Sequence, residues 1–373
     1  MIAMLQSILL YSVITILLLK LIAILFVHKS NPFHRDLHRK FIIVSGATSG
    51  VGRELVIDLF FKGAIVIFLG RRASLVQNEI IPEIKQRLSK LIASGSTTAA
   101  LSLEDLKQDL IDLEKGIFTP KGDFNSKRLV YRRVDLADLT QIKAFADEVR
   151  SRGTPVDILI NNAGSQFHKF SKTAQDIESN VGLNLVSNYY MVECLLDFMA
   201  KEGRIINTAS CIHYLLDNKA KKLNLDEYFI EKQDGYFDFF MYARAKLGVV
   251  LFTSGLHQLI ERRGLNVKAV CLHPGVVMSH FMHNLHPTLT AIYKLTRVPF
   301  SWTLMKSPAQ GMQTTLYCSS IPYEQLEGGK YYSECGRATP SAAVTAENVN
   351  AIMQRCSDVV CKATKEPVKQ LCL

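Results

Sequence analysis

The chain has 373 residues, a formal net charge of +10 and 48% hydrophobic residues. That length is enough for one α/β core of roughly 250 to 300 residues with extensions. The basic residues are scattered and form no concentrated stripe, so the charge does not predict a nucleic-acid partner. An anionic membrane surface or a phosphate-bearing cofactor explains the charge better.

All eight cysteines lie in the second half of the chain, without a CxxC pair. They are Cys194, Cys211, Cys271, Cys318, Cys335, Cys356, Cys361 and Cys372. This usage is typical of reduced thiols and favours a domain that faces the cytosol. The histidines show no ligand pattern, and no metal site is expected.

The first predicted element is a helix over Ala3 to Val27, which is almost wholly apolar and long enough to cross a bilayer. The alternatives are a cleaved signal peptide, which normally has a shorter apolar run after a basic segment, and a buried core helix. Basic residues follow the segment from His28 to Lys40. That charge predicts a single-pass protein whose main domain faces the cytoplasm.

Strand-like runs then alternate with helix-like stretches. The runs cover Phe41 to Val44, Ala64 to Leu69, Leu129 to Val134, Val156 to Ile160, Arg204 to Asn207 and Val267 to Leu272. This alternation predicts a Rossmann-like, doubly wound parallel sheet with helices on both faces. Such sheets bind ligands at the carboxyl ends of their strands.

The predicted organisation is an anchor over 1–28, a basic linker over 29–39, one domain over 40–360 and a tail over 361–373. The crossover after Arg72 is longer than one helix requires, so we expect a surface insertion over about 74–127. Its helices are predicted near 78–93 and 102–115. Contact with a membrane or a second copy in a homodimer is an alternative role for it.

A glycine-rich turn, Ser45 to Gly52, follows the first strand and leads into a helix. Glycines there let the backbone approach a pyrophosphate, and the helix N-terminus supplies free N–H groups. The GxxxGxG spacing alone is weak evidence, because many tight turns contain glycine. Its position between a strand and a helix favours a dinucleotide site.

The second strand ends at Gly70, Arg71 and Arg72, where an enzyme that selects NAD would carry an acidic residue. Two arginines can instead bind a 2′-phosphate through charge-assisted hydrogen bonds. The alternative is a solvated basic pair. The missing acid favours NADP(H).

Tyr242 and Lys246 have the YxxxK spacing, which puts both on one face of a helix. A nearby ammonium favours the phenolate and lowers the pKa of a tyrosine, which makes it a usable proton donor or acceptor. By itself YxxxK is common on helix surfaces. The preceding motifs favour the catalytic interpretation.

With these motifs in order, the sequence resembles the short-chain dehydrogenase/reductase family over about residues 40–360. The resemblance implies a catalytic set of Asn184, Ser210, Tyr242 and Lys246. It implies cofactor contacts from Ser45, Gly46, Ser49, Gly50, Val51, Gly52, Arg71, Arg72, Asp135, Leu136, Asn162, Ala163, Gly164, Tyr242, Lys246, Pro274, Gly275 and Ser279.

The chemistry implied is hydride transfer between the nicotinamide and the substrate carbon. Tyr242 would protonate the carbonyl oxygen, Ser210 would polarise it, and Lys246 would lower the tyrosine pKa. Asn184 would help to hold a water connected to the lysine.

The closest resemblance is to the retinol dehydrogenase-like, microsomal branch, which implies the endoplasmic reticulum membrane. Features that carry it include Gly70–Arg72, the segment from Tyr242 to Thr253, and Leu272 to Gly275. The apolar segment from Val276 to Trp302 matches the family's substrate lid and predicts an apolar substrate, retinol or retinal first. Packing of that segment as a core helix pair, a steroid or other lipid substrate, and a catalytically silent membrane scaffold are alternatives.

Overall fold

The computed structural model describes residues 29–33, 36–116, 127–219, 223–230, 236–277 and 305–371. The predicted anchor over 1–28, the predicted cofactor residue Ser279 and most of the predicted lid lie outside the described residues.

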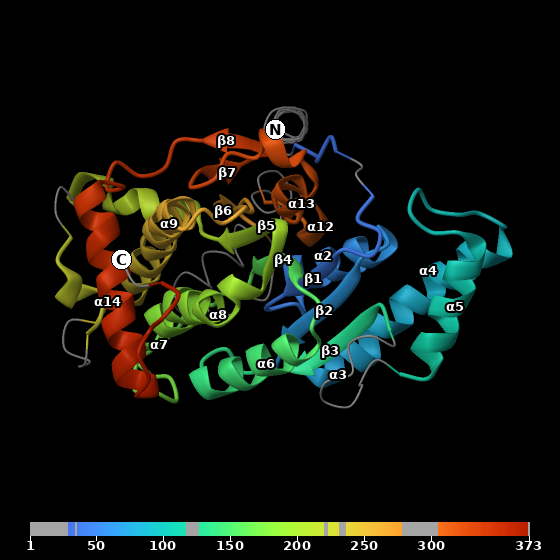
Figure 1. Ribbon diagram of the computed structural model, residues 1–373, viewed down its shortest axis with the longest axis horizontal. Helices are drawn as coiled ribbons and strands as arrows, with labels where there is room; N and C mark the ends of the chain where they lie inside the picture. The colour runs from blue at the N-terminus through green and yellow to red at the C-terminus, as the bar shows by residue number, and fades with distance from the viewer. Residues whose placement is uncertain are drawn as a thin grey trace, which may run out of the picture.

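One eight-stranded sheet runs through the domain in the order β3-β2-β1-β4-β5-β6-β7-β8, parallel except for β8 (Figure 1). The strands are β1 (Phe41–Val44), β2 (Ile65–Gly70), β3 (Leu129–Arg133), β4 (Val156–Asn161), β5 (Met199–Thr208), β6 (Val267–His273), β7 (Tyr331–Ser333) and β8 (Gly336–Ala338). The predicted Rossmann-like parallel sheet is therefore confirmed.

The central strands are apolar along their whole length because both faces of the sheet are covered. All four residues of β1 are buried. Strand order reverses between β1 and β4, and in such a sheet the crevice at this reversal is where ligands bind.

Helices cover both faces of the sheet and form two apolar cores (Figure 1). The first core contains α6 (Leu139–Ser151), α8 (Ser187–Leu195), α9 (Asp238–Arg262) and α14 (Ala346–Thr364). The second contains α2 (Gly50–Phe61), α4 (Ile81–Ala93), α5 (Leu103–Glu114) and α13 (Gln313–Ser320).

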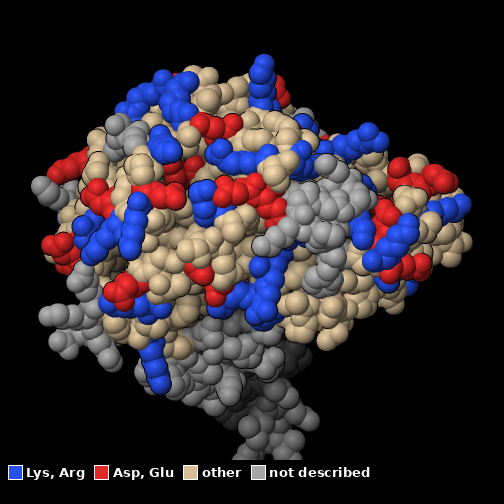
Figure 2. All heavy atoms as spheres, turned by 60° about the horizontal axis from the view of Figure 1, so that its bottom comes forward, with Lys and Arg blue, Asp and Glu red and all other residues tan. Residues whose placement is uncertain are grey.

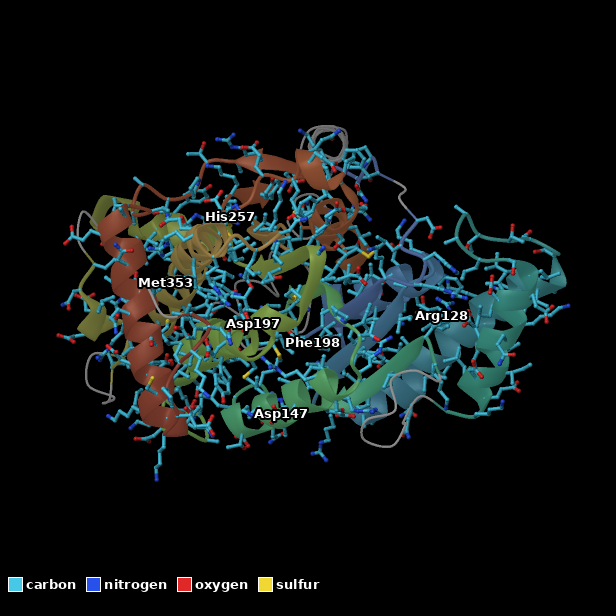
Figure 3. All side chains as sticks on the ribbon, viewed as in Figure 1. Arg128, Asp147, Asp197, Phe198, His257 and Met353 are labelled. Carbon is cyan, nitrogen blue, oxygen red and sulfur yellow. The ribbon has the colours of Figure 1, made fainter. Side chains whose placement is uncertain are left out.

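Helix α9 is central to the fold and carries two of the predicted catalytic residues. Among the described residues it is the one helix long and apolar enough to cross a membrane, but 78% of its most apolar stretch is buried in the domain. A Cβ on Gly255 would lie 2.6 Å from Cγ of Met353, so α9 packs closely on α14 (Figure 3). Helix α9 is thus a core helix.

The insertion after Arg72 contains both predicted helices, α4 and α5, after α3 (Ala73–Leu75) and a π-helical turn over Val76–Ile80. The helical pair extends from the β3 edge of the sheet (Figure 1). Arg128 joins it to the domain, because its guanidinium pairs with Asp109 of α5 and donates to the carbonyl oxygens of Phe60 and Ala64 at 3.1 Å (Figure 3).

Both ends of the described chain pack against the domain. Near the start, Asn31 is buried, and its backbone N–H donates to Oε1 of Gln313 over 3.0 Å. Beyond α14, the carboxylate of Glu193 accepts backbone hydrogen bonds from Lys369, Gln370 and Leu371. These contacts extend the packed structure to both sides of the 40–360 range.

Charged side chains of both signs alternate over the face of the molecule in Figure 2. Lys and Arg form no continuous stripe on that face.

Candidate active site

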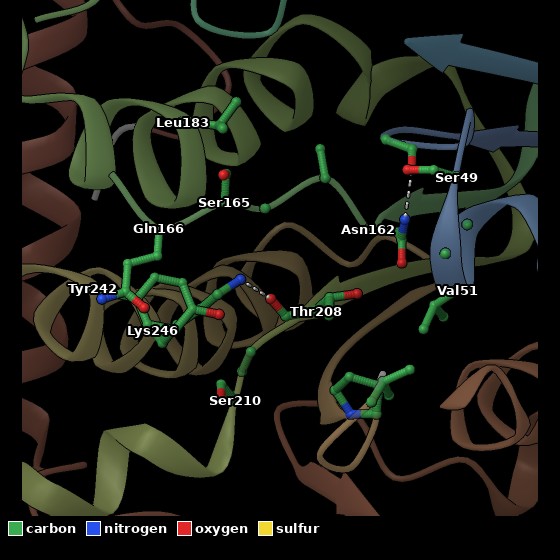
Figure 4. Close-up of a pocket in the computed structure, with 18 of the residues that line it drawn as sticks. Ser49, Val51, Asn162, Ser165, Gln166, Leu183, Thr208, Ser210, Tyr242 and Lys246 are labelled. Atoms are coloured by element: carbon green, nitrogen blue, oxygen red, sulfur yellow. Dashed lines mark hydrogen bonds between the residues drawn. The ribbon is translucent and has the colours of Figure 1, made fainter. Parts of the chain in front are cut away.

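A cavity of about 940 Å³ opens at the carboxyl ends of the central strands (Figure 4). Apolar and polar groups from β1, β2, β4, β5 and β6 and from α9 share its wall. The predicted site residues that line it are Gly46, Ser49, Gly50, Val51, Gly52, Arg71, Arg72, Asp135, Leu136, Asn162, Ala163, Gly164, Ser210, Tyr242, Lys246, Pro274 and Gly275. The fold therefore brings together motifs that are far apart in the sequence.

The turn after β1 requires glycine on steric grounds. Gly46 has φ +64°, and a Cβ there would lie 2.5 Å from Cα of Ala163. A Cβ on Gly52 would lie 2.5 Å from the carbonyl oxygen of Gly46. The backbone of this turn and the start of α2 are consequently open to a ligand in the cavity.

Ser45 lies behind the turn and does not line the cavity. Its hydroxyl oxygen accepts hydrogen bonds from the backbone N–H groups of Asn162 and Ala163, both at 3.1 Å. In return, Nδ2 of Asn162 donates to the carbonyl oxygens of Ser45 and Gly46 at 3.0 and 3.2 Å. Ser45 thus supports the cofactor turn from below, whereas the sequence predicted a direct contact.

The end of β2 places two arginines at the mouth of the cavity. Arg72 donates to the hydroxyl of Ser49, and the guanidinium of Arg71 lies 3.6 Å from the carboxylate of Asp135. The Arg71 side chain is 63% exposed, so it can reorient toward a ligand. Both guanidinium groups border the glycine turn.

Helix α9 presents Tyr242 and Lys246 to the cavity one helical turn apart (Figure 4). The hydroxyl of Tyr242 is hydrogen bonded to that of Ser210, which follows β5. Nζ of Lys246 donates to the carbonyl oxygen of Thr208 over 2.8 Å and lies 5.6 Å from the centre of the Tyr242 ring. Three of the four predicted catalytic residues therefore meet at the end of one strand.

Burial dominates the protonation of this pair. It raises the pKa of Tyr242, an effect that Cys211 increases and the hydrogen bond from Ser210 opposes. Burial also lowers the pKa of Lys246 to about 7. We expected an ammonium at Lys246 to lower the tyrosine pKa, but in the ligand-free protein desolvation favours the neutral form of both groups.

Asn184, the fourth predicted catalytic residue, is fully buried and does not line the cavity. It lies in a π-helical turn over Gly182–Val186. Its Nδ2 donates to the carbonyl oxygen of Ser165 over 2.8 Å, and its Oδ1 accepts from the N–H of Ser165 over 3.3 Å. A Cβ on Gly164 would lie 2.8 Å from Asn184 Oδ1 and 3.0 Å from Lys246 Nζ, so only glycine lets these side chains approach.

Pro274 and Gly275 follow β6, and Lys306 supports them. A Cβ on Gly275, which has φ +92°, would lie 2.5 Å from Cδ of Lys306. Lys306 is buried, and its Nζ lies 2.6 Å from the carboxylate of Glu334 in the β7–β8 turn. Burial is the main cause that lowers the pKa of the adjacent His273 to about 4, so this histidine is neutral at pH 7.

Sequence reasoning missed several residues of the cavity wall. They are Thr48, Gly70, Val134, Ser165, Gln166, Leu183, Thr208, Ala209, Cys211, Ile212, Tyr214, Leu215, Phe239, His273, Val276 and Val277. Gln166 had a usable signal, because it stands two residues after the Asn-Asn-Ala-Gly segment. Lys306 had none, because its role depends on a distant hairpin. Among the described residues no group of three His, Cys, Asp or Glu side chains is arranged to hold a metal ion.

These features fit a dinucleotide. Gly46 and Gly52 leave no room for side chains, the start of α2 borders the cavity, and Lys246 is a buried donor at its far end. Fold and site together define a Rossmann-fold oxidoreductase with a nicotinamide cofactor.

Comparisons with known proteins identify the family. A model described as short chain dehydrogenase matches residues 112–214. Retinol dehydrogenase 14 of Mus musculus is 28% identical over 301 residues, which cover 80% of this chain and 79% of that protein. Polyprenol dehydrogenase of Homo sapiens is 27% identical over 311 residues, which cover 81% and 79%.

Solved structures show the same fold. An uncharacterised protein from Mycobacterium Paratuberculosis has a TM-score of 0.59 at 20% identity and covers 90% of this chain and 96% of its own. A short chain dehydrogenase from Burkholderia cenocepacia J2315, in complex with NADP, has a TM-score of 0.51 at 17% identity, with 80% and 96% covered. The chain belongs to the short-chain dehydrogenase/reductase family and is retinol dehydrogenase-like.

Proposed function

We propose that this oxidoreductase uses NADP(H) and acts on an apolar alcohol or carbonyl compound, with retinol and retinal as the first pair to test. The observation that carries the cofactor proposal is the pair Arg71 and Arg72 beside the glycine turn, without an acidic residue at the end of β2. Planar guanidinium groups bind phosphate through paired, charge-assisted hydrogen bonds. An acid at that position would instead repel a 2′-phosphate.

The bound nicotinamide would supply or accept the hydride. On the protein side, Ser210 and Tyr242 present adjacent hydroxyls, so both can donate to one carbonyl oxygen. Because burial keeps the phenol of Tyr242 protonated, it can deliver a proton to that oxygen during reduction. Lys246 becomes effective when a ligand stabilises its ammonium, which then favours the phenolate that the proton transfer leaves.

Substrate class is inferred from the cavity wall and the relatives. Apolar side chains of Leu183, Ile212, Leu215, Phe239 and Val276 line the substrate side. Pockets of this composition favour apolar ligands, with a few polar groups that set orientation. The relatives named for retinol and polyprenol are consistent with a lipid alcohol. A steroid or other lipid carbonyl is the alternative within the same class.

We further propose that an N-terminal helix over residues 1–28 anchors the domain at the endoplasmic reticulum membrane, on its cytoplasmic side. The apolar length of Ala3 to Val27 and the basic residues after it support this. A bilayer concentrates poorly soluble substrates beside the enzyme.

The test uses full-length protein purified in detergent. Retinal, a ketosteroid, a long-chain aldehyde and a short polar carbonyl are offered with NADPH and with NADH, and Tyr242→Phe is the inactive control. We expect NADPH-dependent reduction of at least one of the three apolar compounds. A higher kcat/KM for the short polar carbonyl than for all three would overturn the substrate proposal, and no turnover of any compound would favour a silent scaffold.

A further inference from the structure

The loop after β4 is held rigidly at two points. Asn184 binds both the N–H and the carbonyl oxygen of Ser165, at 3.3 and 2.8 Å. The side chain of Asn180 does the same for Phe167, with distances of 3.0 and 3.1 Å. The residue between these two clamps, Gln166, is consequently fixed in position, which favours a role in recognition over a role in a mobile loop.

Gln166 is 3% exposed and lines the cavity that contains Tyr242 and Lys246. Figure 4 shows its side chain directed from this loop toward α9. Gly164, two residues earlier, touches the position of Lys246 Nζ. The amide of Gln166 therefore lies on the substrate side, close to the proposed proton donor.

Asp238 determines which way the Gln166 amide points. Nε2 of Gln166 lies 3.2 Å from Oδ2 of Asp238, in the first turn of α9. A carboxylate oxygen accepts hydrogen bonds, so the NH₂ group must face it and the amide oxygen must face away. Nδ1 of His168 contacts the same carboxylate oxygen at 3.1 Å, which holds Asp238 in place.

Oε1 of Gln166 is thus a fixed hydrogen-bond acceptor in a largely apolar cavity. Among the described residues no group donates to it. A buried acceptor that loses its partner costs about 1–3 kcal/mol, so a ligand that displaces water from this oxygen must supply a donor. A purely apolar ligand cannot do so.

We propose that Gln166 Oε1 accepts a hydrogen bond from a hydroxyl or N–H group that the substrate carries near its reacting carbon. The inference rests on the oxidoreductase function proposed above and narrows its substrate class. The preferred compounds are apolar carbonyls or alcohols with a second, hydrogen-bond-donating group. Such a group distinguishes them from retinal, whose chain has none.

The experiment combines a change in the substrate with a change in the protein. Steady-state kcat/KM with NADPH is measured for 2-decanone, 1-hydroxy-2-decanone and 4-hydroxy-2-decanone, with wild type and Gln166→Leu. Dividing each hydroxyketone value by the 2-decanone value, and then wild type by variant, cancels intrinsic reactivity. Because a satisfied buried acceptor is worth about 1–3 kcal/mol, this double ratio should reach about tenfold or more for at least one hydroxyketone.

Two further variants separate recognition from structure. Asp238→Asn keeps the side-chain shape but lets the Gln166 amide adopt either orientation, so its double ratio should be smaller than that of Gln166→Leu but above one. Gln354→Leu makes the same chemical change on the exposed face of α14 and should leave the double ratio at one. If Gln166→Leu does not fold, Gln166→Met, which is unbranched, replaces it.

A double ratio near one for both hydroxyketones would refute the role of Gln166 while leaving the oxidoreductase function intact. Failure of wild type to reduce any carbonyl compound with either cofactor would instead refute the proposed function, and this inference with it. The two failures are therefore distinguishable.

Discussion

The carbonyl oxygen of Thr208 accepts a hydrogen bond of 2.8 Å from Nζ of Lys246. Thr208 ends β5 two residues before Ser210, so one strand end positions the lysine and the serine together. Lys246 is buried at 1% exposure, and desolvation is the cause that lowers its pKa to about 7. A ligand that offers acceptors to this amine must therefore compete with loss of its proton near neutral pH.

This lowered pKa predicts that the affinity for NADPH depends on pH. A lysine whose pKa is about 7 in the folded protein is cationic below that pH and loses its charge as the pH rises through it. We expect the dissociation constant of NADPH to increase between about pH 7 and pH 9 in wild type. NADPH fluorescence titrations over this range would measure it. Lys246→Met should lack this dependence, and an equal slope in both proteins would contradict the assignment.

The hydroxyl of Tyr242 is predicted to be essential for turnover but not for binding. Tyr242→Phe removes only the oxygen that contacts Ser210, so the fold and the cofactor site should persist. Positioned proton transfer contributes about 10²- to 10⁴-fold, so kcat should fall at least about a hundredfold. The NADPH dissociation constant should change little. Retention of more than about a tenth of wild-type turnover would exclude Tyr242 as the general acid.

The two arginines at the end of β2 should contribute unequally to cofactor choice. Arg72 already contacts Ser49 at the glycine turn, whereas Arg71 is largely exposed and paired with Asp135. Loss of a charge-assisted phosphate contact costs about 1.5–3 kcal/mol, so Arg72→Ala should raise the KM for NADPH by about tenfold or more. The KM for NADH should change less. Arg87→Ala, in the inserted helix pair, is the control, and equal losses for both cofactors would show that Arg72 does not read the 2′-phosphate.

The contact around Gly164 predicts a large effect from one methyl group. A Cβ in Gly164→Ala would meet Asn184 Oδ1 at 2.8 Å and Lys246 Nζ at 3.0 Å, and both atoms are held by hydrogen bonds. We expect kcat to fall by about tenfold or more, because small misplacements of catalytic groups are costly. Gly336→Ala is the matched control, since its Cβ would have no neighbour closer than 3.9 Å. Similar activity of the two variants would contradict this geometry.

The central sheet was predictable because its strands are buried on both faces and form continuous apolar runs. The prediction for β1 coincides with the observed Phe41–Val44. The start of β5 was missed because Lys201 and Glu202 are exposed and carry no apolar signal. β7 and β8 were missed because each has three residues, joined by Glu334 and Cys335 in the left-handed conformation that glycine normally occupies.

At the candidate site, the motif residues were predictable because their spacing is short and each motif follows a strand. Their catalytic and binding roles stay predictions. The partners that support them were not predictable, because they come from distant parts of the chain. Asn184 acts on Ser165 through the π-helical turn, and Lys306 supports Gly275 from beyond the region over 278–304.

The last prediction concerns the junction between the proposed anchor and the domain. Lys29 donates its backbone N–H to Glu334 over 3.4 Å, and the Asn31 side chain donates to Ser320 over 2.9 Å. Removal of residues 1–28 should therefore release a soluble protein that still binds NADPH. Removal of residues 1–33 should also release it, but the loss of the buried Asn31 costs about 1–3 kcal/mol. Its melting temperature should then be lower by several degrees, because about 1 kcal/mol corresponds to roughly 2–4 °C for larger domains. Full-length protein that alkaline carbonate extracts from membranes would exclude a spanning anchor, and equal melting temperatures of the two truncations would show that residues 29–33 do not stabilise the domain.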